Sequence, residues 1–334
     1  MDILLLDTLV PEAVAWLAER HVVQFRPELA NNAMAFCLAA APAKAIVVSR
    51  QQIITRQMLS GLPQLRVIGR LQPRTESNTD LTACQDRGIK LVQVNGSNVR
   101  STAEYVLISL LLLYRRSLVP VIRSQDSVLR NPDSTSSMGR ELMGSTVGLI
   151  GLSPASQLLA GMLSALGVKL LGYDSAVHHS SEVWRSLKIK PVPLEQLLAQ
   201  SDAVSLQMAY APRFRHFFGD RLLAHCKLGQ LWVSVSRSSL FEPEALAEAL
   251  GDGRIESCLI DGVDGDFLTP SSPLQGLDNL LVTPELGSHT REARLRASWH
   301  MAHRLHEALE ENNNIPAMTE FETAATEPIA LGDF

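Results

Sequence analysis

The chain has 334 residues, of which 46% are hydrophobic and 19% are charged, and its formal net charge at pH 7 is -5. This length allows two domains with separate cores, and the composition excludes a disordered chain. The sequence pI of about 6.0 excludes the basic surface that binding to nucleic acid or an anionic membrane requires, so we expect neither as a direct partner.

The cysteines and the first residues bear on the compartment. The four cysteines are widely spaced, with no CxxC pair and no histidine arranged for zinc, so we expect free thiols in a reducing environment. The start MDILLLDTLVPE is acidic and soon polar, unlike a signal peptide. The longest apolar run, Tyr105 to Tyr114, is roughly half of a membrane span. A cytoplasmic protein is therefore predicted.

The first part of the chain alternates short apolar runs with helical patterns. Strands are predicted at residues 3–6, 22–25, 45–48, 65–69 and 91–94, and helices at 11–20, in the Ala-rich stretch before 45, and between 69 and 91. Such alternation predicts a parallel sheet that is covered by helices on both faces.

A second series of elements begins near Asn98. A long apolar helix at 102–116 leads through a polar loop to a strand-helix-strand unit at 147–174. Further strands are predicted at 203–206, 231–235, 257–261 and 280–282, with helices at 194–199, 220–224 and 243–252, and a charged helix closes the fold at 290–312. Two mononucleotide-type halves follow, in which ligands bind at the carboxyl ends of the strands. Residues 313–334 read as a flexible tail.

The strand-helix-strand unit, VGLIGLSPASQLLAGMLSALGVKLLGYD, carries an altered dinucleotide-binding turn. Apolar residues 147–150 predict a buried strand, 151–156 a turn and 157–166 a helix. The glycine series G-x-G-x-x-G provides a tight turn, close approach to the pyrophosphate and close helix packing. Here the series reads Gly151, Ser153, Ser156. The scaffold is therefore legible, whereas its phosphate chemistry is in question.

Three longer stretches resemble one known family. They are STAEYVLISLLLLYRR, VSVSRSSLFEPEALAEAL and LIDGVDGDFLTPSSPLQGLDNLLVTPELGSHT, and they are similar to the linking helix, the arginine segment and the acid-histidine segment of the D-isomer-specific 2-hydroxyacid dehydrogenases. This family includes phosphoglycerate dehydrogenase, hydroxypyruvate reductases and the CtBP corepressors. The resemblance covers residues 1 to 311.

The resemblance implies an α/β fold with two Rossmann-like domains. A flavodoxin-like substrate-binding domain would comprise residues 1–97 and 290–312, and a doubly wound NAD-binding domain would comprise residues 98–289. Catalysis would take place in the cleft, and a homodimer would form largely through the cofactor domain. The family transfers a hydride between a nicotinamide and the 2-carbon of a small hydroxy or keto acid.

The resemblance assigns three catalytic positions. Arg237 stands where the family arginine binds the substrate carboxylate, a task that suits a guanidinium fork. Asp266 replaces the family's glutamate, and Glu285 replaces its histidine. A free glutamate titrates near pH ~4.3 and a free histidine near ~6.5, so a glutamate is expected to be a poor proton donor at neutral pH. Two neighbouring carboxyls could raise the pKa of one of them. His289 is an alternative that reads better as a helix-start residue.

The substrate loop after the strand at 65–69 also departs from the family. Arg70 is followed by LQPRTESNTD, where the family has a small loop with glycine whose amides receive the substrate. Gln72 brings a side chain, and the next residue, Pro73, has no N–H to donate. Arg70 or Arg74 could bind an anion instead, although a solvated loop is the simpler interpretation. The resemblance also places Asn98 among the substrate-binding residues.

For the cofactor, the resemblance assigns the turn residues Gly151, Ser153, Pro154 and Ala155, together with Asp174 and Asp261. Ser153 adds a side chain at the pyrophosphate position, and Pro154 removes an N–H donor. Asp174 lies where the family's acid binds the adenine ribose, which favours NAD over NADP; a strand-end cap is the alternative. Two further departures are Gln207 for a frequent histidine and Ser238 for glycine after the arginine.

Three functions stay open at this point. The first is a diverged NAD-dependent oxidoreductase acting on a small 2-keto or 2-hydroxy acid. The second is a pseudoenzyme that binds NAD weakly or not at all and acts as a regulator or assembly partner. The third is a non-redox enzyme that reuses the cleft for another small acid. The fold cannot decide between them, because function depends on the site.

Overall fold

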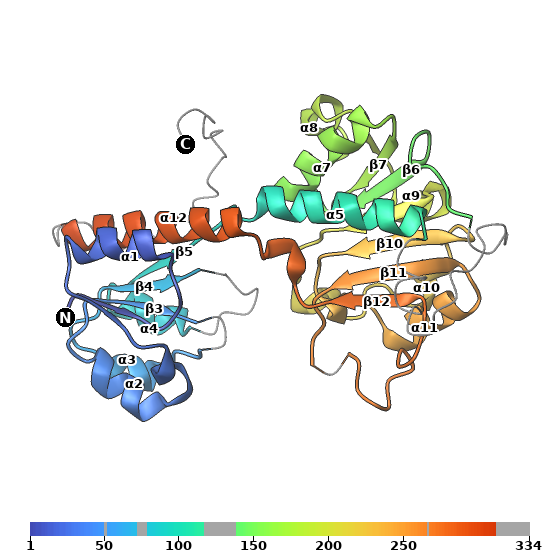
Figure 1. Ribbon diagram of the computed structural model, residues 1–334. Helices are drawn as coiled ribbons and strands as arrows, with labels where there is room; N and C mark the ends of the chain where they lie inside the picture. Colours follow the sequence, from blue (N-terminus) through green and yellow to red (C-terminus); the bar gives the residue numbers. More distant parts are fainter. Residues whose placement is uncertain (50–51, 72–78, 117–137, 266, 312–334) are drawn as a thin grey trace, which may run out of the picture. The chain divides into compact units, whose positions relative to one another are not determined.

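The computed structural model describes residues 1–49, 52–71, 79–116, 138–265 and 267–311 (Figure 1). The chain divides into two compact units: the first contains Met1–Asn98 and the chain from Arg291, and the second is Val99–Thr290. Each unit has a parallel sheet with helices on both faces. The predicted α/β class with two Rossmann-like units is therefore confirmed. The predicted tail, 313–334, lies outside the described residues.

The first unit has the flavodoxin-like strand order β2-β1-β3-β4-β5, all parallel. The strands are β1 (Ile3–Leu5), β2 (Val23–Phe25), β3 (Ala45–Val48), β4 (Val67–Arg70) and β5 (Lys90–Gln93). The helices are α1 (Pro11–Ala18), η1 (Pro27–Asn31), α2 (Ala33–Ala40), α3 (Arg56–Ser60), α4 (Leu81–Asp86) and α12 (Arg291–Glu310).

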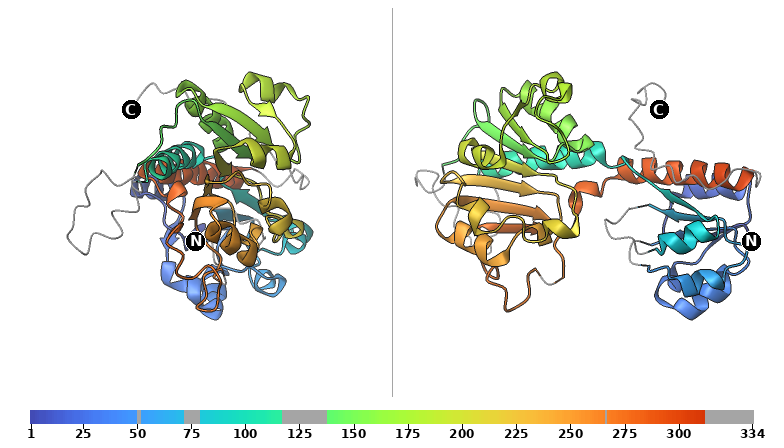
Figure 2. Two further views of the ribbon diagram at one scale, coloured as in Figure 1. Left: turned by 90° about the vertical axis from the view of Figure 1, so that its right-hand side faces the viewer. Right: turned by 180° about the vertical axis from the view of Figure 1, so that it is seen from behind.

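Helices cover both faces of this sheet, so both faces are buried. Successive strand residues point to opposite faces. Ile3 and Leu5 pack under α1 and α12, whereas Leu4 packs against α2, α3 and α4. Figures 1 and 2 show α12 lying beside α1 over the same face. The last helix of the chain thus completes the core of the N-terminal unit.

The second unit has the order β12-β11-β10-β9-β6-β7-β8, again parallel. Its strands are β6 (Thr146–Ile150), β7 (Lys169–Tyr173), β8 (Lys190–Pro191), β9 (Ala203–Leu206), β10 (Gln230–Ser234), β11 (Ile255–Asp261) and β12 (Leu280–Thr283). Its helices are α5 (Val99–Tyr114), α7 (Pro154–Ala165), α8 (Glu182–Ser186), α9 (Leu194–Gln200), η3 (Pro212–Phe214), α10 (Asp220–Leu223), η4 (Ser238–Leu240), α11 (Pro243–Gly251) and η5 (Leu286–Ser288).

The strand order of the second unit reverses between β6 and β9, which are neighbours in the sheet but not in the sequence. In doubly wound sheets such a switch point opens the crevice that receives a ligand, at the carboxyl ends of the strands. Gly151 and Gln207 directly follow these two strands. The predicted nucleotide turn therefore lies where the topology favours binding.

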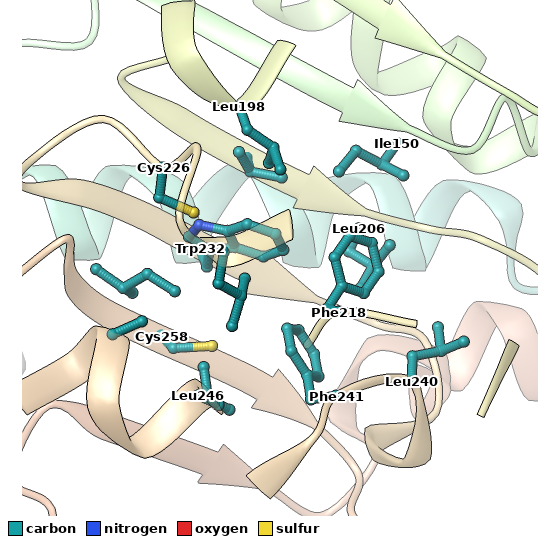
Figure 3. Close-up of a cluster of buried hydrophobic side chains, with 14 of the residues drawn as sticks. Ile150, Leu198, Leu206, Phe218, Cys226, Trp232, Leu240, Phe241, Leu246 and Cys258 are labelled. Carbon is teal, nitrogen blue, oxygen red and sulfur yellow. The ribbon is translucent and has the colours of Figure 1, made fainter. Parts of the chain in front are cut away.

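The core beneath this edge is aromatic. Trp232 of β10 packs against Phe218 and Phe241, with ring centroids 5.5 and 5.7 Å apart (Figure 3). Cys226 and Cys258 belong to the same cluster and are free thiols. Burial raises the pKa of the Cys226 thiol to about 12, so this thiol is a packing residue at neutral pH.

The structure extends the predicted elements in two places. Helix α7 begins at Pro154 rather than 157, because Ser153 caps it and proline suits the first helical position. The sequence interpretation also missed α3, α8 and β8, all short. In the described part of the chain, no helix combines the length and apolar character needed to cross a membrane.

Candidate functional site

The tight turn after β6 requires glycine at its first position. Gly151 has φ +91°, and a Cβ added there would lie 2.6 Å from the carbonyl oxygen of Gln207. The amide of Gly151 donates to the carbonyl of Tyr173 over 2.8 Å. Glycine alone tolerates both this backbone region and this close approach. The retained glycine therefore keeps β6, β7 and β9 together at the switch point.

Ser153 occupies the turn with its own side chain. Its Oγ accepts a hydrogen bond from the Ser156 amide over 3.1 Å and donates one to Oε1 of Gln207 over 3.1 Å. Pro154 has no N–H. The amides of Ser153 and Ala155 are then the backbone donors that an anion could meet at this helix start. The Ser153 hydroxyl thus occupies the Ser156 N–H, a donor that a glycine at position 153 would leave free for a phosphate.

Asp174 directly follows β7 and caps the same turn. Its Oδ2 accepts from the Leu152 amide over 2.7 Å, and its Oδ1 accepts from the Ala176 amide over 2.8 Å. The capping role weighed from the sequence is therefore real. Each carboxylate oxygen can accept a second hydrogen bond, so a ribose contact is compatible with the cap and stays a prediction.

A pocket of about 610 Å³ is lined by Tyr173, the last residue of β7, and by residues that follow β8. Apolar side chains, among them Tyr173, Leu194 and Phe217, form part of its lining, and His216, Arg221 and three carboxylates add polar groups. Its size suits a small organic ligand. A dinucleotide site of this fold has a tight turn for the pyrophosphate, an acid for the ribose and a pocket for the base. The turn at Gly151, Asp174 and this pocket offer these three features, whereas Ser153 and Pro154 reduce the number of backbone N–H donors for the phosphates.

Arg237 is held at the carboxyl end of β10 by an acid that the sequence interpretation missed. Its Nη2 lies 3.2 Å from Oδ1 of Asp264, and its guanidinium lies over the ring of Tyr210, 5.1 Å from the centroid. The Arg237 side chain is 23% exposed. Asp264 lies three residues after the end of β11. An acid in the loop that follows a strand end is the sequence signal that could have identified it.

Ser238, noted as a departure from glycine, has a structural use. Its Oγ accepts from the amide of Asp264 over 2.8 Å, and Oδ2 of Asp264 accepts from the Ser239 amide over 3.3 Å. These bonds fix the carboxylate that orients Arg237. The serine therefore supports the arginine rather than weakening its position.

Asp261 ends β11 and organises the loop after β12. Its carboxylate accepts from the hydroxyl of Thr283 over 2.7 Å and from the amides of Leu286 and Gly287 over 2.7 and 2.8 Å. The hydroxyls of Tyr105 and Thr283 lie 2.5 Å apart. Asp261 is thus the cap of η5, and its predicted cofactor contact is untested.

Glu285 begins this loop in a left-handed conformation, with φ 59° and ψ 40°. A Cβ added to Gly262 would lie 2.6 Å from Cγ of Glu285, so the glutamate side chain rests against the backbone of that glycine. Nδ1 of His289 donates to the Glu285 carbonyl over 2.6 Å. His289 therefore closes the loop through Nδ1, and its role as a substitute for the histidine stays untested.

The substrate residues predicted in the first unit are only partly described. Gln72 and Arg74, like the predicted acid Asp266, lie outside the described residues. Arg70 is 5% exposed, and its guanidinium donates to the Thr79 hydroxyl over 2.8 Å and the Gln52 carbonyl over 2.9 Å. It holds loop segments together, and its substrate role, like that of the exposed Asn98, stays a prediction.

Comparisons with known proteins agree with this geometry. The family described as D-isomer specific 2-hydroxyacid dehydrogenase, NAD binding domain, matches residues 108–287, more than half of the chain. A (S)-sulfolactate dehydrogenase from Chromohalobacter salexigens is 29% identical over 89% of this chain and 95% of its own length. A D-3-phosphoglycerate dehydrogenase from Mycobacterium bovis is 31% identical over 92% of this chain, which spans only 56% of that protein. The solved structure of the TT0316 protein from Thermus thermophilus is 25% identical, with a TM-score of 0.80, over 93% of this chain and 97% of its own.

Proposed function

Because the chain belongs to the D-isomer-specific 2-hydroxyacid dehydrogenase family, we propose that it is an NAD-dependent oxidoreductase acting on a small 2-hydroxy or 2-keto acid. The placement of Arg237 carries this proposal. An arginine held by Asp264 at the carboxyl end of β10 presents a cation at the edge where the sheet receives ligands. A guanidinium there suits the carboxylate of a 2-hydroxy acid.

The residues of the nucleotide turn support NAD rather than NADP. Asp174 places a carboxylate at the end of β7, where a 2'-hydroxyl can donate to it and a 2'-phosphate would be repelled. Bound NAD would supply the hydride acceptor of the reaction. The amides of Ser153 and Ala155 would hold its phosphates against the start of α7, and the pocket beside Tyr173 would receive its base.

Glu285 is the proposed proton acceptor of the reaction. An ionised carboxylate can accept the proton of a substrate 2-hydroxyl, but it cannot donate a proton to a keto oxygen. Oxidation of a hydroxy acid needs the acceptor, and reduction of a keto acid needs the donor. We therefore propose that Glu285 acts as a general base in hydroxy acid oxidation, and that its protonated form returns the proton to the keto oxygen in the reverse reaction.

Titration with NADH, followed by nicotinamide fluorescence, tests cofactor binding. A saturable signal at micromolar to low millimolar NADH is expected, and its absence would overturn the proposal. Turnover is then measured in both directions with 2-hydroxy acids and with glyoxylate or hydroxypyruvate.

Two substitutions at one position test the base. Glu285→Gln keeps the size and removes the basic oxygen, so oxidation should fall by about 100-fold or more. Glu285→His should gain reduction of keto acids. Unchanged oxidation in Glu285→Gln would reject Glu285 as the base, while NADH binding in the same variant reports that the fold is intact.

A pseudoenzyme is the second candidate, favoured by the Ser153 hydroxyl at the nucleotide turn. It predicts NADH binding without turnover in either direction, or no binding. A non-redox enzyme would instead bind small acids through Arg237 without nucleotide, so an Arg237→Ala protein with undiminished acid binding would reject it. Assembly into a homodimer through the second unit belongs to the main proposal, and light scattering tests it.

A further inference from the structure

Two histidines meet where α1 and α12 pack together in the first unit. His21 follows α1, and His306 lies in α12; Nε2 of His21 is 2.9 Å from Nδ1 of His306. Glu310 lies one helical turn after His306, so both side chains share one face of α12. The ligand atoms of these three residues all lie within 4.8 Å of one another.

We propose that His21, His306 and Glu310 form a binding site for a divalent transition-metal ion of the zinc class. Two imidazole nitrogens and one carboxylate oxygen are ligands that zinc accepts at about 2.0–2.2 Å. Calcium and magnesium prefer oxygen ligands alone. The mixed donor set therefore selects a borderline metal, with solvent completing its coordination.

The distances need little adjustment. Two nitrogens bound to one tetrahedral zinc at about 2.0–2.1 Å are about 3.3 Å apart, compared with the 2.9 Å between the ring nitrogens of His21 and His306. A small rotation of either ring opens this gap. Glu310 is exposed, so its carboxylate can close the remaining distance at low cost. The ion would replace the hydrogen bond between the imidazoles, and the proton of that bond would move to the other nitrogen of its own ring, so that both facing nitrogens offer lone pairs to the metal.

The surroundings favour a neutral ring at His21 and a restricted orientation of the ring at His306. Burial lowers the pKa of His21, and the neighbouring His306 adds to this effect; the neutral ring is the form that binds a metal. The ring of Trp16 lies edge-on to His306, with centroids 5.3 Å apart. This aromatic wall restricts the orientation of the histidine and provides a fluorescent reporter beside the site.

A bound ion would link α12 to the residues that follow α1. His21 and His306 are 285 residues apart in the sequence, and α12 supplies Met301 and Leu305 to the core beneath the sheet. An ion that binds only the folded chain stabilises it by an amount that rises with the logarithm of the ion concentration once this exceeds the dissociation constant. The site would thus act as a clamp on the substrate-type unit, independent of the nucleotide turn.

The experiment uses full-length, tag-free protein that has been treated with chelator and dialysed. Calorimetric titration with zinc chloride should show one ion per chain, and the melting temperature should rise with zinc. Cobalt(II) should give the visible absorption of a four- or five-coordinate nitrogen-oxygen site and quench the fluorescence of Trp16. Removing a hydrogen-bond partner of a metal ligand typically lowers metal affinity by ~10–100-fold, and removing the ligand itself should lower it further. His306→Ala should therefore weaken zinc binding by at least about 100-fold.

Matched variants keep the result interpretable. His303→Ala removes another histidine of α12, and Glu307→Gln removes another acid of α12; both should leave zinc affinity unchanged. Glu310→Gln alters an exposed side chain, so it tests the site even where a histidine variant fails to fold. Three results would overturn the proposal. Zinc could still bind to the double variant His21→Ala and His306→Ala, or the His303→Ala control could lose zinc binding as fully as His306→Ala. The native chain could also fail to bind zinc at concentrations below millimolar.

Discussion

The hydroxyl of Ser153 donates a hydrogen bond to Oε1 of Gln207 over 3.1 Å, and this bond joins the turn after β6 to the end of β9. The two residues meet at the switch point of the sheet, where the family's second glycine would leave room for a pyrophosphate. The bond therefore stabilises the scaffold at a position that otherwise serves the cofactor.

Substitutions at Ser153 separate the effect of the hydroxyl from that of the Cβ. Ser153→Ala frees the Ser156 amide but keeps the Cβ, and Ser153→Gly removes both obstacles. We expect NADH to bind more tightly in the order glycine, alanine, serine, with a gain of roughly 2- to 10-fold for one recovered amide hydrogen bond. The dissociation constants are measured by nicotinamide fluorescence. Weaker binding in both variants would show that the hydroxyl itself contacts the cofactor.

Glycine at position 151 is predicted to be indispensable for stability. Gly151→Ala places a Cβ 2.6 Å from the Gln207 carbonyl oxygen in a left-handed backbone, so we expect a loss of at least ~2 kcal/mol in the free energy of unfolding. Gly161→Ala is the matched control, because nothing lies within 4 Å of its added Cβ and it lies inside α7. This change should stabilise by about 0.5–1 kcal/mol. Urea unfolding measures both, and equal effects would contradict the prediction.

The carboxylate of Asp261 should control the loop that carries Glu285. Asp261→Asn keeps one acceptor oxygen and turns an amide N–H toward another donor, so we expect the free energy of unfolding to fall by about 1–3 kcal/mol. Hydrogen exchange at the amides of Leu286 and Gly287 should accelerate. Thr283→Val removes one donor to the same carboxylate and should act in the same direction, whereas Thr283→Ser keeps the hydroxyl and should cost less. Unchanged exchange in Asp261→Asn would refute this role.

Asp202 should contribute an acid-sensitive part of the stability. Burial acts to raise its pKa, but hydrogen bonds from Nζ of Lys227 at 2.5 Å and from the Thr146 amide at 2.8 Å outweigh burial and lower it. Because the folded-state pKa lies below the unfolded value of about 3.9, this stabilisation is complete above about pH 4 and is lost as the pH falls through the folded-state pKa.

The test compares urea unfolding of the native chain and Asp202→Asn at two pH values. At pH 7 the variant should be less stable by about 1–3 kcal/mol, and the difference should shrink progressively below about pH 4. Lys227→Met should reproduce part of the loss at neutral pH. A difference that stays constant down to the acid transition would contradict the assignment.

Local pattern was sufficient for the strands of both sheets except β8. Strand β3, and β6 after Thr146, carry no polar side chain because parallel strands are buried on both faces, so their positions follow from the sequence without knowledge of their neighbours. The start of α7 could not be read as easily, since the Ser153-Pro154 pair is equally compatible with a turn. The cap became visible only once the Ser156 amide was seen to bond to Ser153.

By itself, the sequence determined the two α/β units, the family, and the positions of Arg237, Glu285 and the turn at Gly151. Only the tertiary structure decided which groups these residues meet: Asp264 for Arg237, Gln207 for Ser153, and His306 for His21. The physical reason is that burial repeats with a local period along the chain, whereas a polar contact depends on which strand and helix ends the fold brings within hydrogen-bond distance. Those ends are separated by tens to hundreds of residues, and no local pattern records their pairing.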